Sequence, residues 1–251
     1  MRGLQQIAEL LRRATAQVFS GGDGCGSGVV WSEDGLVVTN AHVAREPGVL
    51  VELSDGRRLP GKVTVRDPRR DLALLRIQAD GLDAASPGDS EAVRPGEVVL
   101  AIGSPLGFAG ALSTGVVHSV GTLAGMGKQH WIRANVRLAP GNSGGPLADT
   151  HGRVVGINTA IVNGLGIAAP SAGVLSLLRR RSLGVTLRPV PAGLAILEVA
   201  RDGAAARASL RAGDVLLCSA DELADALESG EAVVRLRFVR GARLREVAVA
   251  A

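Results

Sequence analysis

Short apolar runs separated by turn-forming residues are the feature that most constrains how this chain can fold. In the first part of the chain these runs cover residues 27–31, 36–39, 49–53, 61–66 and 71–77. The residues between them, at 33–35, 54–56 and 67–68, are rich in Asp, Gly and Pro, which favour turns. Short strands at this spacing, without helices between them, predict a β-barrel or β-sandwich.

A second set of apolar runs repeats this pattern after a polar link at residues 78–96. The runs cover residues 97–102, 113–120, 131–138, 154–161 and 166–169. Two groups of about six strands predict two packed barrels, at about residues 15–80 and 95–170. The chain has only three Phe, two Trp and no Tyr, so Val, Leu, Ile and Ala must fill the cores of these barrels.

The segments on either side of the barrels have a different pattern. Near the start, Leu4, Ile7, Leu10 and Leu11 share one face of a short amphipathic helix. After residue 178 the pattern changes to strand, helix and strand, with strands expected at 193–199 and 233–239 and helices at 203–210 and 220–227. We therefore expect a first domain at residues 1–178 and a small α+β domain at residues 179–251.

Composition excludes several classes of protein. The formal net charge is only +4 and aromatic residues are few, which argues against nucleic-acid binding. No apolar run reaches the roughly 20 residues that a membrane helix needs, and charges interrupt the start where a secretion signal would be apolar. Cys25 and Cys218 lie too far apart to form a metal-binding motif or a disulfide framework. These features predict a cytoplasmic protein without a membrane segment, a metal or a cofactor.

The glycine-rich stretch around Ser143 is the most informative for chemistry. Glycines at 141, 144 and 145 let the backbone bend so that the N–H groups of Gly141 and Ser143 converge beside the Ser143 hydroxyl. Acyl transfer needs such an arrangement, with a nucleophile beside hydrogen-bond donors for the oxyanion. The alternative from this stretch alone is an ordinary turn built from Gly, Ser and Pro.

The same residues satisfy the G-x-S-x-G pattern of α/β-hydrolases, but two observations exclude that fold. An α/β-hydrolase has its acid and histidine after the serine, and a helix follows the serine directly. The only histidine after Ser143 is His151, eight positions later in a turn, and Pro146 stands where the helix should continue. The partners of Ser143 must therefore lie upstream.

Two upstream residues fit the roles of base and acid. His42 follows an apolar strand, on a turn that can display it, although a lone histidine there is often structural. Asp71 leads directly into an apolar run, so its carboxylate should need a buried donor, with pairing to Arg69 or Arg70 as the alternative. Together the three residues stand in the order His, Asp and Ser, with spacings of 29 and 72 residues.

The chain resembles trypsin-like serine proteases of the HtrA/DegP class. The resemblance lies at residues 26–30 (GSGVV), 39–43 (TNAHV), 71–75 (DLALL), 101–107 (AIGSPLG), 140–147 (PGNSGGPL) and 156–161 (GINTAI). It implies a chymotrypsin-type pair of antiparallel β-barrels, with His42, Asp71 and Ser143 as the catalytic triad and the Gly141 and Ser143 N–H groups as the oxyanion hole.

The resemblance also implies where the substrate is recognised. The primary specificity pocket would involve Leu138, Ile161 and Val162, whose aliphatic side chains predict cleavage after Val, Ala, Ile or Leu. Arg137 stands where trypsin carries its pocket acid; whether it faces the pocket, where it would repel a basic side chain, or solvent, specificity for Arg or Lys is not expected.

The C-terminal segment resembles a small PDZ domain. Leu183, Gly184 and Val185 would form the loop and strand edge that bind a peptide C-terminus. The hairpin expected before the second helix is missing, so the module is minimal. The resemblance is also compatible with a homotrimer, although the aromatic residues that such trimers use near the N-terminus are absent.

These inferences predict a serine endopeptidase that acts on unfolded or flexible polypeptides in protein quality control or regulated proteolysis. The alternative is a catalytically silent, chaperone-like or peptide-binding protein in which the triad never assembles.

Overall fold

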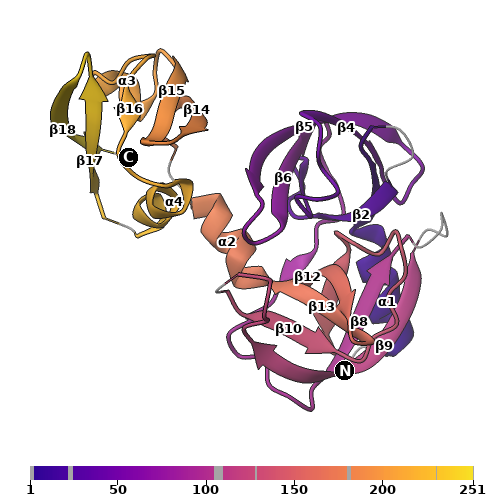
Figure 1. Cartoon of the computed structure of the whole chain (residues 1–251). Helices are drawn as coiled ribbons and strands as arrows, with labels where there is room; N and C mark the ends of the chain where they lie inside the picture. Colours follow the sequence, from indigo (N-terminus) through magenta and orange to yellow (C-terminus); the bar gives the residue numbers. More distant parts are fainter. Residues whose placement is uncertain are drawn as a thin grey trace. The chain divides into compact units, whose positions relative to one another are not determined.

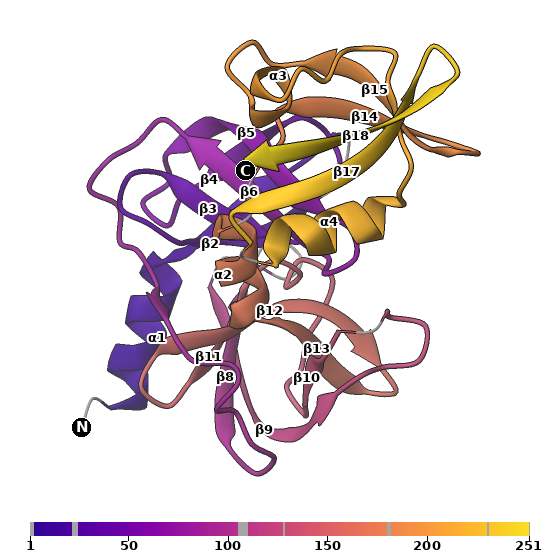
Figure 2. The ribbon, with the colours of Figure 1, turned by 90° about the vertical axis from the view of Figure 1, so that its left-hand side faces the viewer.

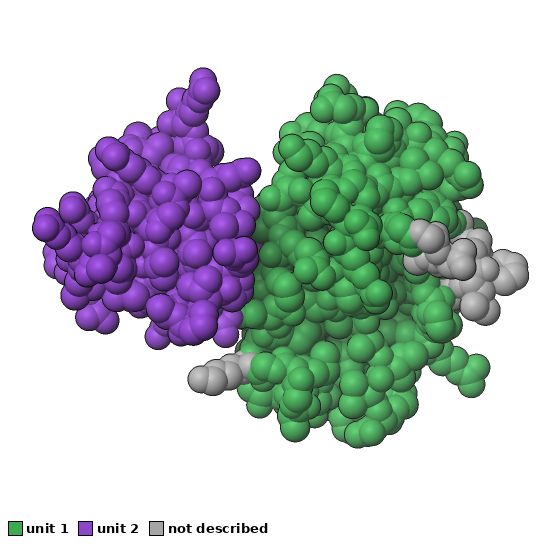
Figure 3. Space-filling model, turned by 45° about the horizontal axis from the view of Figure 1, so that its top comes forward, with its two compact units in different colours: residues 1–175 green, residues 176–251 purple. Residues whose placement is uncertain are grey.

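The computed structural model describes residues 3–21, 25–104, 110–127, 129–179, 182–229 and 231–250. Residues 105–107 of the AIGSPLG stretch lie outside the described residues. The chain divides into two compact units, residues 1–175 and 176–251 (Figure 1, Figure 3). The expected domain boundary, after residue 178, lies three residues further along the chain.

Six antiparallel strands of the first unit close into a barrel. Their order around the barrel is β1-β2-β3-β6-β5-β4. Val49 and Val51 point inward while Leu50 is exposed, the alternation expected of a strand with one buried face. The strands are β1 (Thr15–Phe19), β2 (Cys25–Val30), β3 (Leu36–Thr39), β4 (Gly48–Glu52), β5 (Arg58–Asp67) and β6 (Leu72–Ile77).

A second barrel forms from six later strands of the same unit. The sheet runs β11-β8-β9-β10-β13-β12 and is closed by pairing of β11 with β12, while β7 adds to β12 as a short parallel strand. Its buried core is aliphatic, as the composition predicts. The strands are β7 (Ser86–Pro87), β8 (Val98–Gly103), β9 (Ala111–Gly121), β10 (Trp131–Ala134), β11 (Pro146–Asp149), β12 (Arg153–Val162) and β13 (Leu165–Pro170).

Helix α1 (Leu4–Arg13) opens the first unit and packs against β1 and β8 (Figure 2). Ile7, Ala8 and Leu11 are buried, whereas Leu4 and Leu10 are exposed, so the apolar face is narrower than the sequence suggests. Among the described residues, no helix is both long enough and apolar enough to cross a membrane.

The second unit is a five-stranded antiparallel sheet with helices. The strand order is β14-β15-β16-β17-β18, which leaves β14 and β18 as the edges. Helix α4 is capped by Ser219, whose Oγ accepts a hydrogen bond from the Glu222 N–H at 3.1 Å. The elements are α2 (Ser171–Arg179), which begins within the first unit, β14 (Val185–Val190), β15 (Gly193–Val199), α3 (Ala204–Arg207), β16 (Val215–Leu216), α4 (Ala220–Glu228), β17 (Val233–Arg240) and β18 (Arg243–Ala250).

The predicted fold class is confirmed. The chain is mainly β, with two closed antiparallel barrels followed by a small unit that mixes strands and helices. The regular alternation of strands and turns predicted this result, and in the described parts of residues 15–170 no helix interrupts the run from β1 to β13.

Asp67, at the end of β5, holds the tight turn that leads to Asp71. Its carboxylate is buried, and it accepts hydrogen bonds from the Arg69 N–H at 2.9 Å and from Arg70 Nη1 at 2.8 Å. Burial alone would raise the pKa of Asp67, but the hydrogen bond and charge of Arg70 and the charge of Arg69 outweigh it, so the pKa is lowered. The carboxylate therefore stabilises the folded turn in its ionised form.

We predict that Asp67→Asn destabilises the first unit by about 2 kcal/mol at pH 7, because hydrogen bonds to a charged group are lost. A lowered pKa in the folded state means that this stabilisation is complete above the unfolded pKa of about 4 and is lost as the pH falls further. The difference between wild type and variant should therefore shrink below about pH 4. Urea unfolding followed by fluorescence measures it, because Trp31 and Trp131 both lie in the first unit. A difference that stays constant with pH would contradict the prediction.

Candidate functional site

His42 lies on a helical turn directly after β3. The Asn40 carbonyl accepts hydrogen bonds from the N–H groups of Val43 and Ala44, which closes the turn. Ala41 and Ala44 are buried on either side, so the turn is anchored by its small residues. The His42 side chain is 42% exposed and can therefore meet a substrate from solvent.

Asp71 fixes the orientation of the His42 ring. Its Oδ2 lies 2.6 Å from His42 Nδ1, and its Oδ1 accepts the His42 backbone N–H at 2.9 Å. A carboxylate can only accept, so Nδ1 carries the proton and Nε2 is left to act as a base. The alternative in which Asp71 serves only to pair with Arg69 or Arg70 does not hold, since both of its carboxylate oxygens are bonded to His42.

The turn before Ser143 fixes the direction of one backbone donor. The Asn142 N–H donates to the Ala139 carbonyl at 3.0 Å, and Gly141 has a φ of 103°. Pro140 cannot adopt a positive φ, so these values define a type II turn with Gly at its third position. The peptide between Pro140 and Gly141 sets where the Gly141 N–H points, and a glycine is needed for this geometry.

Ser143 and His42 line one cavity. A pocket of about 480 Å³ is lined by both residues together with Gly141, Cys25 and Arg45, among others. The Ser143 hydroxyl donates to the Thr159 carbonyl at 3.0 Å. A hydroxyl has one proton, so in this structure it is not directed at His42.

Gly144 lets the nucleophile loop approach the first barrel closely. Its φ is 91°, and a Cβ built on it would lie 1.9 Å from the Ser27 carbonyl oxygen. No side chain fits there, so the glycine after Ser143 is required by the contact between β2 and the loop. The two barrels are thus in direct contact beside the candidate nucleophile.

Ser27, on β2, is a residue whose role the sequence did not reveal. Its Oγ donates to the Gly141 carbonyl at 2.6 Å and accepts from the Ser104 N–H at 2.9 Å, while its own N–H donates to the Ser143 carbonyl at 2.7 Å. It therefore ties the loop to the first barrel on both sides of Asn142. Its place within the GSGVV stretch was the only available signal.

The residues expected to form the specificity pocket lie near one another but differ in exposure. Leu138 is half-buried and lies against Gly166 of β13, and Ile161, whose partner across the sheet is Gly166, is 52% exposed. Val162 is half-buried at the end of β12. Arg137 is exposed, with its N–H donating to Ser113 Oγ.

The residues expected to bind a peptide C-terminus lie at the start of the second unit's sheet. Leu183 is buried in the core of that unit, and Gly184 has a φ of 70°. The Gly184 N–H donates to Ser182 Oγ at 3.1 Å. Val185 begins β14, which is an edge strand.

Cys25 is a second potential nucleophile in the cavity, but its environment opposes that role. The residue is exposed to solvent, but partial desolvation, and secondly the charge of Glu52, raise the pKa of its thiol. A thiol with a raised pKa is protonated at neutral pH and reacts poorly. Within the part of the chain that the structure describes, no cluster of three or more His, Cys, Asp or Glu could hold a metal ion.

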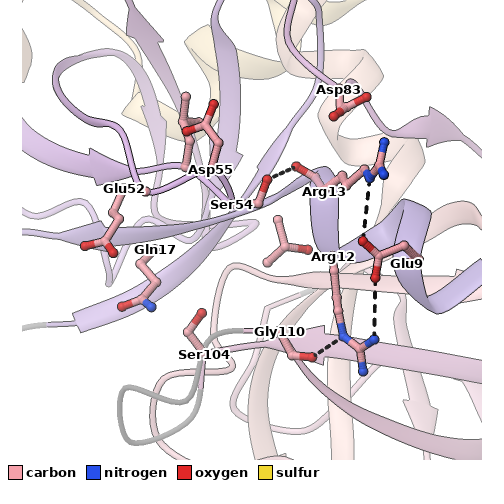
Figure 4. Close-up of a pocket in the computed structure, with 13 residues that line it drawn as sticks. Glu9, Arg12, Arg13, Gln17, Glu52, Ser54, Asp55, Asp83, Ser104 and Gly110 are labelled. Atoms are coloured by element: carbon pink, nitrogen blue, oxygen red, sulfur yellow. Dashed lines mark hydrogen bonds and ion pairs between the residues drawn. The ribbon is translucent and has the colours of Figure 1, made fainter.

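A separate pocket of about 510 Å³ lies beside α1, between the helix and the turn after β4 (Figure 4). Three of its charged side chains are engaged with one another: Arg12 and Arg13 both pair with Glu9, and Arg12 Nε also donates to the Gly110 carbonyl. This pocket contains no His and no residue of the Ser143 cavity.

The geometry can now be compared with known proteins. A family model described as a trypsin-like peptidase domain matches residues 26–157, which include His42, Asp71 and Ser143. The chain belongs to the trypsin-like peptidase family. The resemblance to the HtrA/DegP class is confirmed, because DegP-like relatives and HtrA-type structures match this trypsin-like peptidase.

Curated relatives are named probable periplasmic serine endoprotease DegP-like. The protein from Pseudomonas putida (strain W619) is 38% identical over 76% of this chain and 46% of its own length. The protein from Chlamydia trachomatis serovar D is 35% identical over 76% of this chain and 45% of its own length. The chain thus spans just under half the length of these relatives.

Solved structures of HtrA-type proteases share the fold over nearly the whole chain. The protease AlgW with a decapeptide has a TM-score of 0.67 and 25% identity, covering 99% of this chain and 98% of that chain. A serine endoprotease from Yersinia pestis has a TM-score of 0.65 and 25% identity, covering 100% of this chain and 97% of that one.

The expectation of a cytoplasmic protein is wrong. The matching relatives from Pseudomonas, Halomonas and Chlamydia are named as periplasmic, which points to an exported protein. The expectation relied on charges near the start of the printed sequence. Glu9, Arg12 and Arg13 belong to α1, which packs against β1 and β8, so their charges report on a folded helix and not on location.

We predict that Ser27→Ala lowers kcat for a peptide substrate about 10-fold, because the Gly141 carbonyl loses the hydroxyl that holds the turn in place. Deleting an oxyanion donor outright costs about 100- to 1,000-fold, and misplacing one should cost less. Ser171→Ala is a matched control, since its buried Oγ donates to a backbone carbonyl, that of Gly88, at 2.7 Å. Steady-state kinetics in which both variants lose activity equally would contradict this role.

Proposed function

We propose that this protein is a serine endopeptidase in which Ser143 is the nucleophile, His42 the general base and acid, and Asp71 the residue that orients His42. The observation that carries the proposal is the 2.6 Å contact between His42 Nδ1 and Asp71 Oδ2, at a cavity that Ser143 also lines. Membership of the trypsin-like peptidase family supports the same assignment.

In the proposed reaction, the Ser143 Oγ attacks the carbonyl carbon of the scissile peptide bond while His42 Nε2 accepts its proton. His42 then gives the proton to the leaving amine, which leaves an acyl-enzyme at Ser143. Asp71 keeps the ring in the required tautomer and stabilises the imidazolium that forms. Water then attacks the acyl-enzyme with His42 again as base and acid, which frees Ser143 and releases the N-terminal part of the substrate as a carboxylic acid.

The oxyanion that forms during attack would be bound by the N–H groups of Gly141 and Ser143. The type II turn at residues 139–142 sets the direction of the first of these donors. Each such donor contributes roughly 3 kcal/mol to the transition state, because its orientation is set before the reaction begins.

The hydroxyl of Ser143 must turn before it can react. In the structure it donates to the Thr159 carbonyl, at the strand that would line the substrate. We propose that a rotation about the Ser143 side chain, on substrate binding, exchanges this bond for one to His42.

We further propose that the substrates are unfolded or flexible segments cleaved after small or medium aliphatic residues. We assign the specificity pocket to the apolar side chains of Leu138, Ile161 and Val162, of which the first two meet at Gly166. The exposed Arg137 gives no counter-charge for a basic side chain. Aliphatic residues are buried in folded proteins and become accessible in unfolded ones. Such a preference suits protein quality control or regulated proteolysis.

The same relatives support two further proposals, one on where the protein acts and one on what it binds. We propose that the protein acts outside the cytoplasm, as the periplasmic relatives do. We also propose that the second unit is a PDZ-like module in which Leu183, Gly184 and Val185 bind peptide C-termini along the open edge of β14. A homotrimer stays a prediction.

One observation favours the alternative of a silent peptide-binding protein. The Ser143 hydroxyl donates to Thr159 and not to His42, as expected if the triad never assembles. The proposal and this alternative differ in whether Ser143 reacts.

We predict that a fluorophosphonate probe labels Ser143 and that Ser143→Ala abolishes both labelling and hydrolysis of an unfolded protein such as reduced, alkylated casein. The expected loss of kcat is about 10⁶-fold, the scale found when a triad serine is removed. Mass spectrometry of the adduct locates the labelled residue. A well-folded wild type that is neither labelled nor active would favour the binding protein.

We also predict that a mixture of peptides with every residue at the cleaved position is cut mainly after Val, Ala, Ile and Leu. Mass spectrometry of the products gives the preference directly. Leu138→Ala should shift cleavage toward larger side chains, because it removes one wall of the pocket, while Leu50→Ala on the exposed face of β4 should not. Cleavage mainly after Arg or Lys would contradict the assignment of the pocket.

A further inference from the structure

We propose that Asn40 is a positioning residue that couples the acid of the triad to the nucleophile across the two barrels. This inference rests on the proposed function. The side chain of Asn40 is fully buried, at 0% exposure, two residues before His42. Its Nδ2 donates to the Asp71 carbonyl at 2.7 Å and to Thr159 Oγ1 at 3.0 Å.

The two acceptors of Asn40 belong to different barrels. Asp71 immediately precedes β6 of the first barrel, and Thr159 lies in β12 of the second. Thr159 in turn accepts the Ser143 hydroxyl on its carbonyl at 3.0 Å. A chain of hydrogen bonds therefore runs from Asp71 through Asn40 and Thr159 to Ser143.

The orientation of the Asn40 amide follows from its partners. The Asp71 carbonyl can only accept, so the NH₂ group and not the oxygen must face it. The Thr159 hydroxyl is consistent with this, since it donates to the Ile157 carbonyl at 3.0 Å and is free to accept from Asn40. Asn40 Oδ1 is consequently buried without a hydrogen-bond partner.

The two hydrogen bonds that Asn40 donates stabilise the fold as well as the site, so a test of its role must separate stability from positioning. An apolar side chain of the same shape would leave no unpaired oxygen but could not donate to either acceptor. The donation of two hydrogen bonds is what distinguishes asparagine from such a residue.

The backbone of Asp71 is what this geometry most needs to hold. Asp71 has a φ of 52°, in the left-handed region that residues other than glycine seldom adopt. In this conformation its carboxylate reaches both the ring and the backbone N–H of His42. The bond from Asn40 fixes the carbonyl of the same residue and so holds the strained conformation in place.

The test compares three variants with wild type. Asn40→Leu keeps the shape of the side chain and removes both donors, Thr159→Val removes one acceptor, and Ser171→Ala removes a buried side-chain donor that bonds to the Gly88 carbonyl and to no residue of the triad. Because misplacement of a catalytic group by about 1 Å can cost 100-fold, we expect Asn40→Leu to lower kcat about 10- to 100-fold while KM changes less than about twofold. Thr159→Val should lower kcat less, since Asn40 keeps its bond to Asp71.

Two further measurements separate positioning from general stability. The double variant of Asn40 and Thr159 should lose less activity than the product of the two single losses, because both act through one bond. In proton NMR, the downfield resonance of His42 Nδ1–H should shift or disappear in Asn40→Leu and stay in Ser171→Ala. This signal reports the His42–Asp71 bond and does not require turnover.

The outcomes distinguish this inference from the proposed function. An active wild type together with an Asn40→Leu variant of unchanged kcat and unchanged His42 resonance overturns the role of Asn40 and leaves the protease intact. A wild type without activity overturns the protease, and the NMR comparison then still decides whether Asn40 holds the His42–Asp71 pair. If Asn40→Leu fails to fold, the Thr159→Val variant decides: an unchanged kcat with an unchanged resonance overturns the coupling.

Discussion

The loop that carries Ser143 is held against β2 of the first barrel by main-chain contacts, and the positions of His42, Asp71 and Ser143 relative to one another depend on this attachment. Gly144 lies so close to the Ser27 carbonyl that a Cβ could not be placed there, and the Ser27 N–H donates to the Ser143 carbonyl. Since His42 and Asp71 belong to the first barrel and Ser143 to a loop of the second, each barrel alone has an incomplete set. The contact between them assembles the site.

Two aspartates only four positions apart have different tasks in this arrangement. Asp67 is buried, and its negative charge is balanced by the adjacent arginines. The ionised carboxylate therefore stabilises the turn and does not face a substrate. That turn delivers Asp71 to His42 with a left-handed backbone. Arg69 and Arg70 pair with Asp67, whereas both carboxylate oxygens of Asp71 bond to His42. The arginines therefore bind the carboxylate of Asp67, and the carboxylate of Asp71 binds the imidazole of His42.

The sequence predicts the architecture and the pairing of His42 with Asp71 because both rest on local signals: short apolar runs set off by turn residues, and three reactive side chains in a fixed order. It does not predict the roles of Ser27 and Asn40, since a buried serine or asparagine has no signature until the distant residues it contacts are known. The left-handed backbone of Asp71 also arises from tertiary contacts. The expected location failed for a different reason, because charges in a folded helix resemble charges that interrupt a signal segment.

The type II turn before Ser143 has a consequence for how activity could be controlled. Type I and type II turns share their end points and differ mainly in the direction of the central amide plane, here that between Pro140 and Gly141. Gly141 tolerates the φ of either form, because it has no side chain. The cavity at Ser143 can therefore gain or lose one of the two N–H donors proposed for the oxyanion by rotation of a single amide plane, with every strand of both barrels left in place.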